Sequence, residues 1–477
     1  MFKNDFKFCG RSFSACMARL ASFGLCASLL AGISLRAAPH HPLLVISIDG
    51  LRPDYIAEAD QHGLRIPVLR ALFAQGAHAT GVRGVLPTST YPSHTTLVTG
   101  VAPARHGIVG NHPFGVEAEG LDVWYYYSEA LHAATLWDAT TAAGRVVSSV
   151  SWPVTVGAAS IRYNIPEIML TRTDEDLKLT RGAATPGLMA ELAPRAGPYL
   201  SDAQKPVARD WTRARYALEI IRLKKPEFFT VHFAATDHFQ HRSGPFSPSV
   251  LEALEEIDTM IGQLVTAMRE QDPAATFCIV SDHGFSRVDH FCYLDAAFVE
   301  GKLVTLKGPG KTIEKAGIVN WVARTWPAGG SAAIVLHDPA DAAARTKVQT
   351  LLERLAANPA NGIAHVLDET EIKAVGGAPT AQFWVDLKPG YQTSGTLDAK
   401  MIAPAVVSTV SPRGTHGYSP EQAEMNATFI LTGPGIRARG LAQIDMRSIA
   451  PTLAKVMGVD FPSAEMPALD VFTPSSP

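Results

Sequence analysis

Short, continuous runs of apolar residues recur along the chain, and each is followed within a few residues by an aspartate or a glycine. The runs cover 41–48 before Asp49, 228–233 before Asp237, 276–280 before Asp282 and 427–431 before Gly433. Runs of this length that are rich in β-branched and aromatic residues are typical of strands buried on both faces of a sheet. Four buried strands are therefore predicted, three of which end close to a carboxylate.

Stretches with helical periodicity lie between these strands. Within 248–270 the apolar side chains recur every three or four residues, at Val250, Leu254, Ile257, Ile261 and Leu264. Strands that alternate with helices predict an α/β fold with a mostly parallel central sheet flanked by helices. Binding sites in such sheets lie beyond the carboxyl ends of the strands, and the three aspartates are expected there.

The pattern changes between residues 300 and 400. There the sequence predicts strands at 331–337, 363–367 and 381–385 and a helix at 339–357, without the recurring aspartate. We interpret 300–400 as a small α+β insertion that flanks the site and influences substrate choice. It divides the core into 39–299 and 401–477, and a final helix is predicted at 449–457.

The N-terminal segment has a different composition. Lys3, Lys7, Arg11 and Arg19 precede an uncharged, Ala- and Leu-rich stretch at 20–35. This pattern predicts a secretory signal peptide covering 1–38, and hence a periplasmic or secreted protein. The stretch is shorter than the ~20 residues of a membrane-spanning helix, so no stable span is expected after its removal; a retained anchor is the alternative.

Charge and cysteine content limit the partners. Lys and Arg number 42 against 45 Asp and Glu, for a net charge of −3, which does not favour nucleic acid as a scaffold. Cys9, Cys16 and Cys26 lie in the predicted signal, which leaves Cys278 and Cys292. These two either form one disulfide or remain half-buried thiols. The oligomeric state is not indicated.

Six residues at the predicted strand ends and in later loops have the side chains of a metal centre. They are Asp49, Asp237, His241, Asp282, His283 and His416. Histidine nitrogens and carboxylate oxygens are ligands of Zn²⁺, and six of them suffice for two three-ligand sites. Asp237 and His241 are four residues apart, so on a helical turn they share one face. Taken singly, each is explained as well by turn chemistry or an ordinary buried histidine.

A hydroxyl-rich segment, Pro87-Thr-Ser-Thr-Tyr-Pro-Ser-His94, is followed by two further threonines. A Ser or Thr hydroxyl at the start of a helix gains nucleophilicity from a metal and from the positive helix end. The alternative is a helix cap followed by a Thr-rich first turn.

Together these motifs resemble the nucleotide pyrophosphatase/phosphodiesterase family of the alkaline phosphatase superfamily. The matching segments occur in family order: 87–94, Thr99-Gly-Val-Ala-Pro-Ala-Arg-His-Gly-Ile-Val-Gly-Asn111, Thr236-Asp-His-Phe-Gln-His241, Ser281-Asp-His-Gly284 and Thr415-His-Gly-Tyr418. The resemblance implies an alkaline-phosphatase-like core with two zinc ions per chain, held by Asp237, His241 and His416 and by Asp49, Asp282 and His283. It also implies that Thr90 is the nucleophile and contacts the second zinc, and that Asn111 hydrogen-bonds a phosphoryl oxygen.

Substrate contacts are expected from aromatic side chains. Tyr91 matches a family position that stacks on a base, and Trp152 and Tyr163 lie where a leaving group is held, although aromatics there are equally ordinary core. Asn111 and a backbone N–H near Tyr91 are expected to stabilise developing charge. The resemblance implies that related monoesterases have a pair of cations where this chain has Trp152 and Val154, so that pair is not expected here and diesters are expected to be preferred. Arg162 is the alternative source of a cation.

The resulting hypothesis is an exported two-zinc phosphodiesterase or nucleotide pyrophosphatase. It acts on a small, nucleotide-like phosphodiester through a phospho-threonine intermediate. A phosphonoacetate-type C–P hydrolase or a phosphomonoesterase of the same superfamily is the nearest enzymatic alternative. A zinc-binding surface protein that has lost catalysis is the alternative from another class.

Overall fold

The structure, a computed structural model, describes residues 40–115, 123–169, 174–199, 205–397 and 413–474. The predicted signal peptide lies outside the described residues. Within them, no helix is both long enough and apolar enough to cross a membrane. Cys278 and Cys292 are buried and not bonded to each other, so the disulfide alternative is wrong and the two thiols are core residues.

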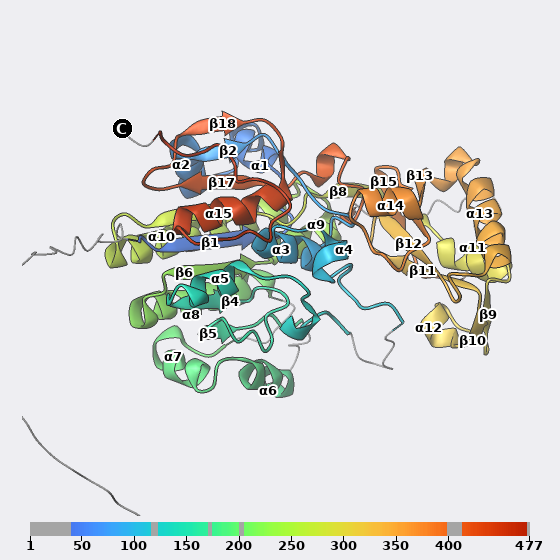
Figure 1. The fold of residues 1–477 in the computed structure, drawn as a ribbon, viewed down its shortest axis with the longest axis horizontal. Coiled ribbons are helices and arrows are strands. Elements are labelled where there is room, and N and C mark those ends of the chain that lie inside the picture. The colour runs from blue at the N-terminus through green and yellow to red at the C-terminus, as the bar shows by residue number, and fades with distance from the viewer. Residues whose placement is uncertain (1–39, 116–122, 170–173, 200–204, 398–412, 475–477) are drawn as a thin grey trace, which may run out of the picture. The chain divides into compact units, whose positions relative to one another are not determined.

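The centre of the fold is an eight-stranded sheet (Figure 1). Its strands lie in the order β18 (Arg439–Leu441), β2 (Ala77–Ala79), β17 (Phe429–Thr432), β7 (Thr276–Val280), β1 (Leu43–Ile48), β6 (Phe228–Phe233), β4 (Val147–Val150) and β5 (Tyr163–Ile165). The five strands from β7 to β5 are parallel, whereas β17 pairs antiparallel with both β7 and β2. The predicted mostly parallel α/β sheet is confirmed.

Helices cover both faces of this sheet because successive side chains of a strand point to opposite sides. In β1, Leu44, Ile46 and Ile48 pack in one cluster and Leu43 and Val45 in another. The first cluster includes α2 (Pro67–Gln75), α7 (Leu188–Ala196), α8 (Pro206–Lys224) and α10 (Pro248–Gln271). The second includes α3 (Thr90–Thr99), α5 (Leu136–Ala142) and α15 (Ile449–Met457). Burial on both faces accounts for the continuous apolar runs of the sequence.

The region predicted as an insertion has its own sheet and its own apolar cluster, drawn in yellow to orange in Figure 1. The antiparallel order is β11 (Ala323–Pro327), β12 (Ser331–Leu336), β14 (Phe383–Leu387) and β13 (Ile363–Asp368). The other elements there are α11 (Leu294–Glu300), the ribbon of β9 (Val304–Leu306) and β10 (Ile318–Trp321), α12 (Ile313–Ala316), α13 (Ala342–Ala356) and α14 (Glu369–Ala374). The insertion boundaries at 300 and 400 stay a prediction, since 398–412 are outside the described residues.

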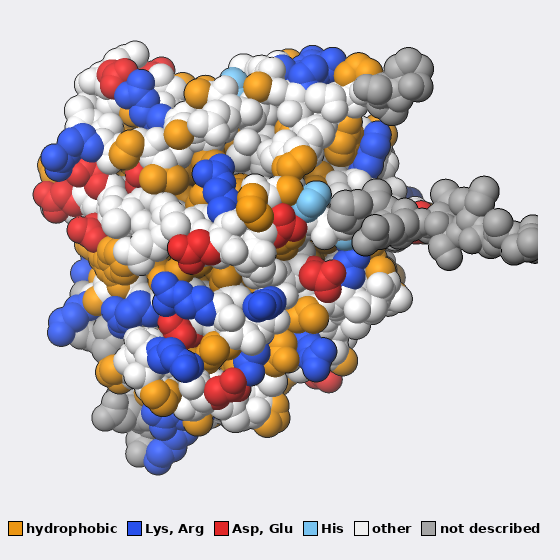
Figure 2. Space-filling view, turned by 90° about the vertical axis from the view of Figure 1, so that its left-hand side faces the viewer, with side chains coloured by type: hydrophobic (Ala, Val, Ile, Leu, Met, Phe, Trp, Pro, Cys, Tyr) orange, Lys and Arg blue, Asp and Glu red, His pale blue; other side chains and the backbone are white. Residues whose placement is uncertain are grey.

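A three-stranded sheet lies next to both the core and the predicted insertion. In it, β8 (Ser286–Cys292) lies between β15 (Gly390–Thr393) and β16 (Arg413–Thr415). The remaining elements are α1 (Asp54–Ala57), β3 (Val82–Arg83), α4 (Pro103–His106), α6 (Asp174–Ala183), α9 (Ala235–Ser243) and β19 (Ile444–Asp445). On the face drawn in Figure 2, basic and acidic side chains are intermixed, in agreement with the near-neutral composition.

Candidate active site

The pairing register of three strands brings the predicted aspartates together. β1 lies between β6 and β7, and Ile48 is level with Phe233 while Ser47 is level with Val280. The three strands therefore end at the same edge, followed by Asp49, by α9 with Asp237, and by Asp282. Gly50 has a φ of 69°, and a Cβ there would lie 2.8 Å from both Gln240 and Phe285. Only glycine fits this turn, and its N–H donates to Asp282 Oδ1 at 3.1 Å.

The histidines reach the same edge from two other elements. His241 is one turn after Asp237 on α9, and its Nε2 lies 3.4 Å from Asp237 Oδ1. β16 pairs antiparallel with β8, so that Thr415 faces Ser286 and His416 comes to lie beside His283. Their rings stack with centroids 3.7 Å apart, and His416 Nε2 is 3.7 Å from Asp237 Oδ1. The structure thus brings all six predicted ligand residues together.

Two groups of these residues have ligand atoms within 4.8 Å of one another: Asp49, Asp282 and His283, and Asp237, His283 and His416. The first group is the predicted one. In the second, His283 takes the place expected for His241, which nevertheless contacts Asp237. His283 therefore lies between the two groups.

The hydrogen bonds of the cluster fit a bound cation. Asp49 Oδ1, Asp237 Oδ1 and Asp282 Oδ2 are buried without a hydrogen-bond partner, a costly state for a carboxylate. Burial and the charges of Asp282 and Asp237 raise the pKa of Asp49 well above its usual range. A divalent cation would relieve both the missing contacts and the repulsion between these carboxylates.

The histidines are oriented as metal ligands usually are. Nδ1 of His241, His283 and His416 lies 3.1, 2.9 and 3.0 Å from the backbone carbonyl of Gly414, Gly284 and Thr88, respectively. If each Nδ1–H donates to its carbonyl, each Nε2 keeps a lone pair toward the carboxylates. Burial and the neighbouring His283 and His241 lower the pKa of His416 to about 3, which keeps this ring neutral.

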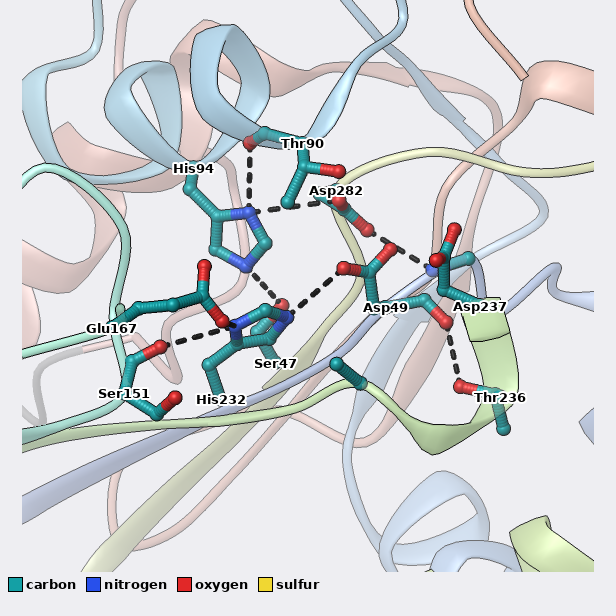
Figure 3. A network of polar contacts seen from close by, with 12 residues as sticks. Ser47, Asp49, Thr90, His94, Ser151, Glu167, His232, Thr236, Asp237 and Asp282 are labelled. Atoms are coloured by element: carbon teal, nitrogen blue, oxygen red, sulfur yellow. Dashed lines mark hydrogen bonds and ion pairs between the residues drawn. The ribbon is translucent and has the colours of Figure 1, made fainter. Parts of the chain in front are cut away.

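Thr90 lies beside the cluster as the first residue of α3 (Figure 3). Its Oγ1 is 3.4 Å from His283 Nε2. The preceding residue, Ser89, occupies the cap position, and its side chain makes no capping hydrogen bond. The helix-cap alternative for Thr90 is therefore not what the structure shows.

Asn111 is also at the site. The backbone N–H of Tyr91 donates to Asn111 Oδ1 at 2.9 Å, so the Tyr91 N–H itself is engaged, and the expected charge-stabilising N–H near Tyr91 stays a prediction. The bond orients the Asn111 amide and leaves Nδ2 as its donor.

Two of the three expected substrate-binding aromatics need correction. Trp152 is fully buried, and its Nε1 points to the backbone oxygen of His94 at 3.4 Å, so it has no surface for a substrate. Tyr163, in β5, lies under Lys224, whose Nζ is 5.0 Å from the ring centroid, and it lines neither cavity of the site. Tyr91 is buried too and packs at 5.1 Å against Trp124; both line one cavity of the site, so a substrate contact by Tyr91 stays a prediction.

A buried network behind the cluster was missed by the sequence analysis (Figure 3). His232, the last but one residue of β6, lies 3.1 Å from Asp49 Oδ2 through Nε2 and 3.2 Å from Glu167 through Nδ1. Burial disfavours charge on this ring, but the two carboxylates outweigh it and raise the pKa of His232 to about 10. A histidine inside an otherwise apolar strand was the one available signal.

The network continues to α9. Arg213 Nη2 is 3.3 Å from Glu167, and its Nη1 is 2.9 Å from Asp210. Asp210 in turn accepts from the backbone N–H groups of Ala234 and Ala235, at the start of the helix that holds Asp237. The network therefore positions two of the three site aspartates.

Two cavities adjoin the cluster and share Asn111, His241 and His416 as lining residues. The first, of 230 Å³, has both polar and apolar walls, and the apolar ones include Pro87, Trp326 and Trp384, the last two from the predicted insertion. The second, of 130 Å³, is lined by Thr90, Tyr91, Trp124, Arg209 and Arg213 among others. Arg209 and Arg213 therefore bring positive charge to the site, whereas Arg162 lines neither cavity.

Fold and site together define an alkaline-phosphatase-like α/β protein with an Asp/His cluster suited to metal ions. The profile of the type I phosphodiesterase / nucleotide pyrophosphatase family matches residues 43–419, and the chain belongs to this family. It is 23% identical over 407 residues to the venom phosphodiesterase CdcPDE of Crotalus durissus collilineatus. The aligned region covers 83% of this chain and 42% of the venom protein. The chain thus spans about two fifths of that relative's length.

Two further proteins extend the comparison. Ectonucleotide pyrophosphatase/phosphodiesterase family member 3 of Rattus norvegicus is 22% identical over 58% of this chain and 29% of its own length. The structure of human ectonucleotide pyrophosphatase / phosphodiesterase 5 superposes with a TM-score of 0.61 at 19% identity, over 90% of this chain and 97% of that one. The murine counterpart, an inactive threonine-to-alanine variant in complex with AMP, gives a TM-score of 0.59 at 20% identity. These structures confirm the fold.

Proposed function

We propose that this chain is a two-zinc phosphodiesterase or nucleotide pyrophosphatase that cleaves phosphodiester or phosphoanhydride bonds through a phospho-threonine intermediate. The observation that carries the proposal is the position of the Thr90 hydroxyl, 3.4 Å from the histidine that lies between the two ligand groups. A nucleophile in contact with a metal-binding cluster is the arrangement that this chemistry needs.

Asp49, Asp282 and His283 would hold one ion, and Asp237, His241 and His416 the other. When bound, the ions would lower the pKa of the Thr90 hydroxyl and stabilise negative charge on the phosphoryl and leaving-group oxygens. Asp49 Oδ1, Asp237 Oδ1 and Asp282 Oδ2 accept no hydrogen bond and face Nε2 atoms of the histidines, which supports this assignment.

Thr90 Oγ releases its proton to solvent and forms a bond to phosphorus, while the bond from phosphorus to the leaving oxygen breaks and leaves its electron pair on that oxygen. Asn111 Nδ2 donates a hydrogen bond to a non-bridging phosphoryl oxygen, in an orientation set by the Tyr91 N–H. Attack by water on the phospho-threonine then releases the second product and restores the Thr90 hydroxyl.

The substrate class is supported by the relatives and by the cavities. The murine relative was obtained with AMP, and the matched venom proteins are named phosphodiesterases. The 230 Å³ cavity, with walls from Pro87, Trp326 and Trp384, suits a nucleoside-like group. The predicted insertion would thereby take part in substrate choice, and removal of a signal peptide at 1–38 would complete an exported enzyme.

The experiment is a comparison of three chromogenic substrates with the purified protein. p-Nitrophenyl thymidine 5′-phosphate and bis-p-nitrophenyl phosphate are expected to exceed p-nitrophenyl phosphate in kcat/KM by about a hundredfold, or about 2.7 kcal/mol. A chelator should abolish turnover and added Zn²⁺ should restore it. A preference for the monoester would contradict the diesterase assignment, and turnover that withstands complete metal removal would contradict the metal mechanism.

A further inference from the structure

The loop that carries Asn111 is held in place from outside. Residues 107–115 contain neither a helix nor a strand, so the backbone there has no ladder of its own. The N–H of Tyr125 donates to Asn111 O at 3.2 Å. The indole Nε1–H of Trp326 donates to His112 O at 3.1 Å, across 214 positions of the chain. The second bond therefore ties the loop to the predicted insertion, to which Trp326 belongs.

The ring of Trp326 also packs against this loop on both sides of Asn111. A Cβ at Gly110 would lie 3.2 Å from Trp326 Cζ2, so the indole approaches the backbone closely because no side chain stands there. On the other side, the rings of Phe114 and Trp326 have centroids 5.4 Å apart. Trp326 lines the 230 Å³ cavity together with Asn111. One half-buried side chain thus fixes the segment from which the Asn111 amide projects.

The hairpin that carries Trp326 is itself joined to the metal-binding cluster. Trp326 is the last but one residue of β11, and the turn from β11 to β12 contacts the loop of His416. The N–H of Gly330 donates to His416 O at 2.7 Å, and a Cβ at Gly417 would lie 1.5 Å from Ala328 O. Because this hairpin is part of a four-stranded sheet, it is a rigid support, which positions site residues more precisely than a loop does.

We propose that Trp326 is a positioning residue that holds Asn111 at the distance from the metal cluster at which its Nδ2 meets the phosphoryl group in the transition state. The predicted insertion thereby contributes to the rate of the chemical step, besides substrate choice. This inference rests on the proposed function, because Trp326 acts through the role given there to Asn111. A displacement of about 1 Å at a reacting site can lower the rate about a hundredfold.

The test is a double-mutant cycle on kcat with substitutions at Trp326 and Asn111. Trp326→Phe removes the Nε1–H and keeps an aromatic ring, and it is expected to lower kcat about three- to tenfold. Asn111→Ala is expected to lower kcat about a hundredfold or more. In the Asn111→Ala background, Trp326→Phe should change kcat by less than about twofold, because the group that it positions is gone. Zinc content should stay that of the wild type in all variants.

Trp384→Phe is the matched control. Trp384 lies in β14 of the same insertion and lines the same cavity, but within the described ranges its Nε1 has no hydrogen-bond partner. Its substitution can alter KM through the cavity wall. Its effect on kcat should be the same, within about twofold, with and without Asn111→Ala.

Three results overturn the proposal: the same loss of kcat from Trp326→Phe in both backgrounds, an unchanged kcat with a lower urea midpoint, and equal coupling of Trp384→Phe to Asn111. Failure of the proposed function is recognised separately, because the cycle is run with whichever chromogenic ester is turned over fastest, and a monoester preference leaves it valid. If none is turned over, the same cycle is measured on the Kd of orthovanadate for the zinc-loaded protein. Trp326→Phe should then weaken binding about threefold or more only while Asn111 is present, and additive or absent effects overturn the proposal.

Discussion

Replacing His232 with alanine should weaken both the fold and the metal centre. The side chain is fully buried and lies within 3.2 Å of Asp49, Glu167 and the Ser151 carbonyl. Its removal leaves two buried carboxylates without a shared partner. Leaving one partner of a buried charged pair uncompensated costs about 3–5 kcal/mol, a large part of the ~5–15 kcal/mol by which a folded domain is stable.

The metal effect follows from the contact with Asp49. Residues that orient a metal ligand typically change affinity by about 10–100-fold when removed, which is about 1.4–2.7 kcal/mol. We therefore expect His232→Ala to weaken binding of at least one Zn²⁺ by that factor. His232→Gln keeps one amide donor in reach of Asp49 and cannot bridge to Glu167, so it should restore more of the metal affinity than of the stability.

Two measurements check this prediction. Urea unfolding followed by circular dichroism, with chelator present, gives the change in stability, and competition with a chromophoric chelator gives the zinc affinity. His365→Ala, at an exposed position of β13, is the matched control and should change neither. The reasoning is refuted if His232→Ala unfolds within about 1 kcal/mol of wild type and binds zinc with unchanged affinity.

Three further predictions can each be tested by a direct measurement: the number of bound zinc ions, the role of Thr90 as nucleophile and the removal of the signal peptide. Elemental analysis of protein purified without chelator should find two zinc ions per chain, and His416→Ala should lose one; full activity with one ion or none would contradict the two-metal assignment. Thr90→Ala should keep its metal while kcat falls by about a thousandfold or more, and Thr90→Ser should retain part of the rate; near-normal turnover of Thr90→Ala would mean that water attacks directly. Mass spectrometry of the exported protein should place its N-terminus near residue 39, and an intact Met1 would contradict the signal peptide.

Local patterns in the sequence were sufficient to predict the main elements of the core. β6 and β7 occupy the predicted residues 228–233 and 276–280, and α15 the predicted 449–457. A strand buried on both faces needs an unbroken apolar run, and a helix on a sheet needs an apolar stripe. Both conditions concern residues that are close together in the sequence. The antiparallel direction of β17 was not predicted, because an apolar run has no direction.

The six candidate ligands were also predictable, because each lies next to a strand end or in a short motif. Asp49, Asp237 and Asp282 follow parallel neighbours whose carboxyl ends must meet at one edge. Their grouping was not predictable, since the position of His283 between the two groups depends on how β16 pairs with β8.

The surroundings of the site were decided by the tertiary structure alone. His232 is 183 positions from Asp49 in the chain, and no local pattern links them. Trp152 is an aromatic residue of the kind that contacts substrates, yet the backbone directs its side chain into the core. Arg209 lies in a helix that carries no recognisable motif, and its side chain nevertheless lines the cavity. The sequence by itself determined which residues are buried and which strand ends bear carboxylates, because these depend on short-range periodicity. Which side chains meet depends on register and packing between distant segments, and only the folded chain decides it.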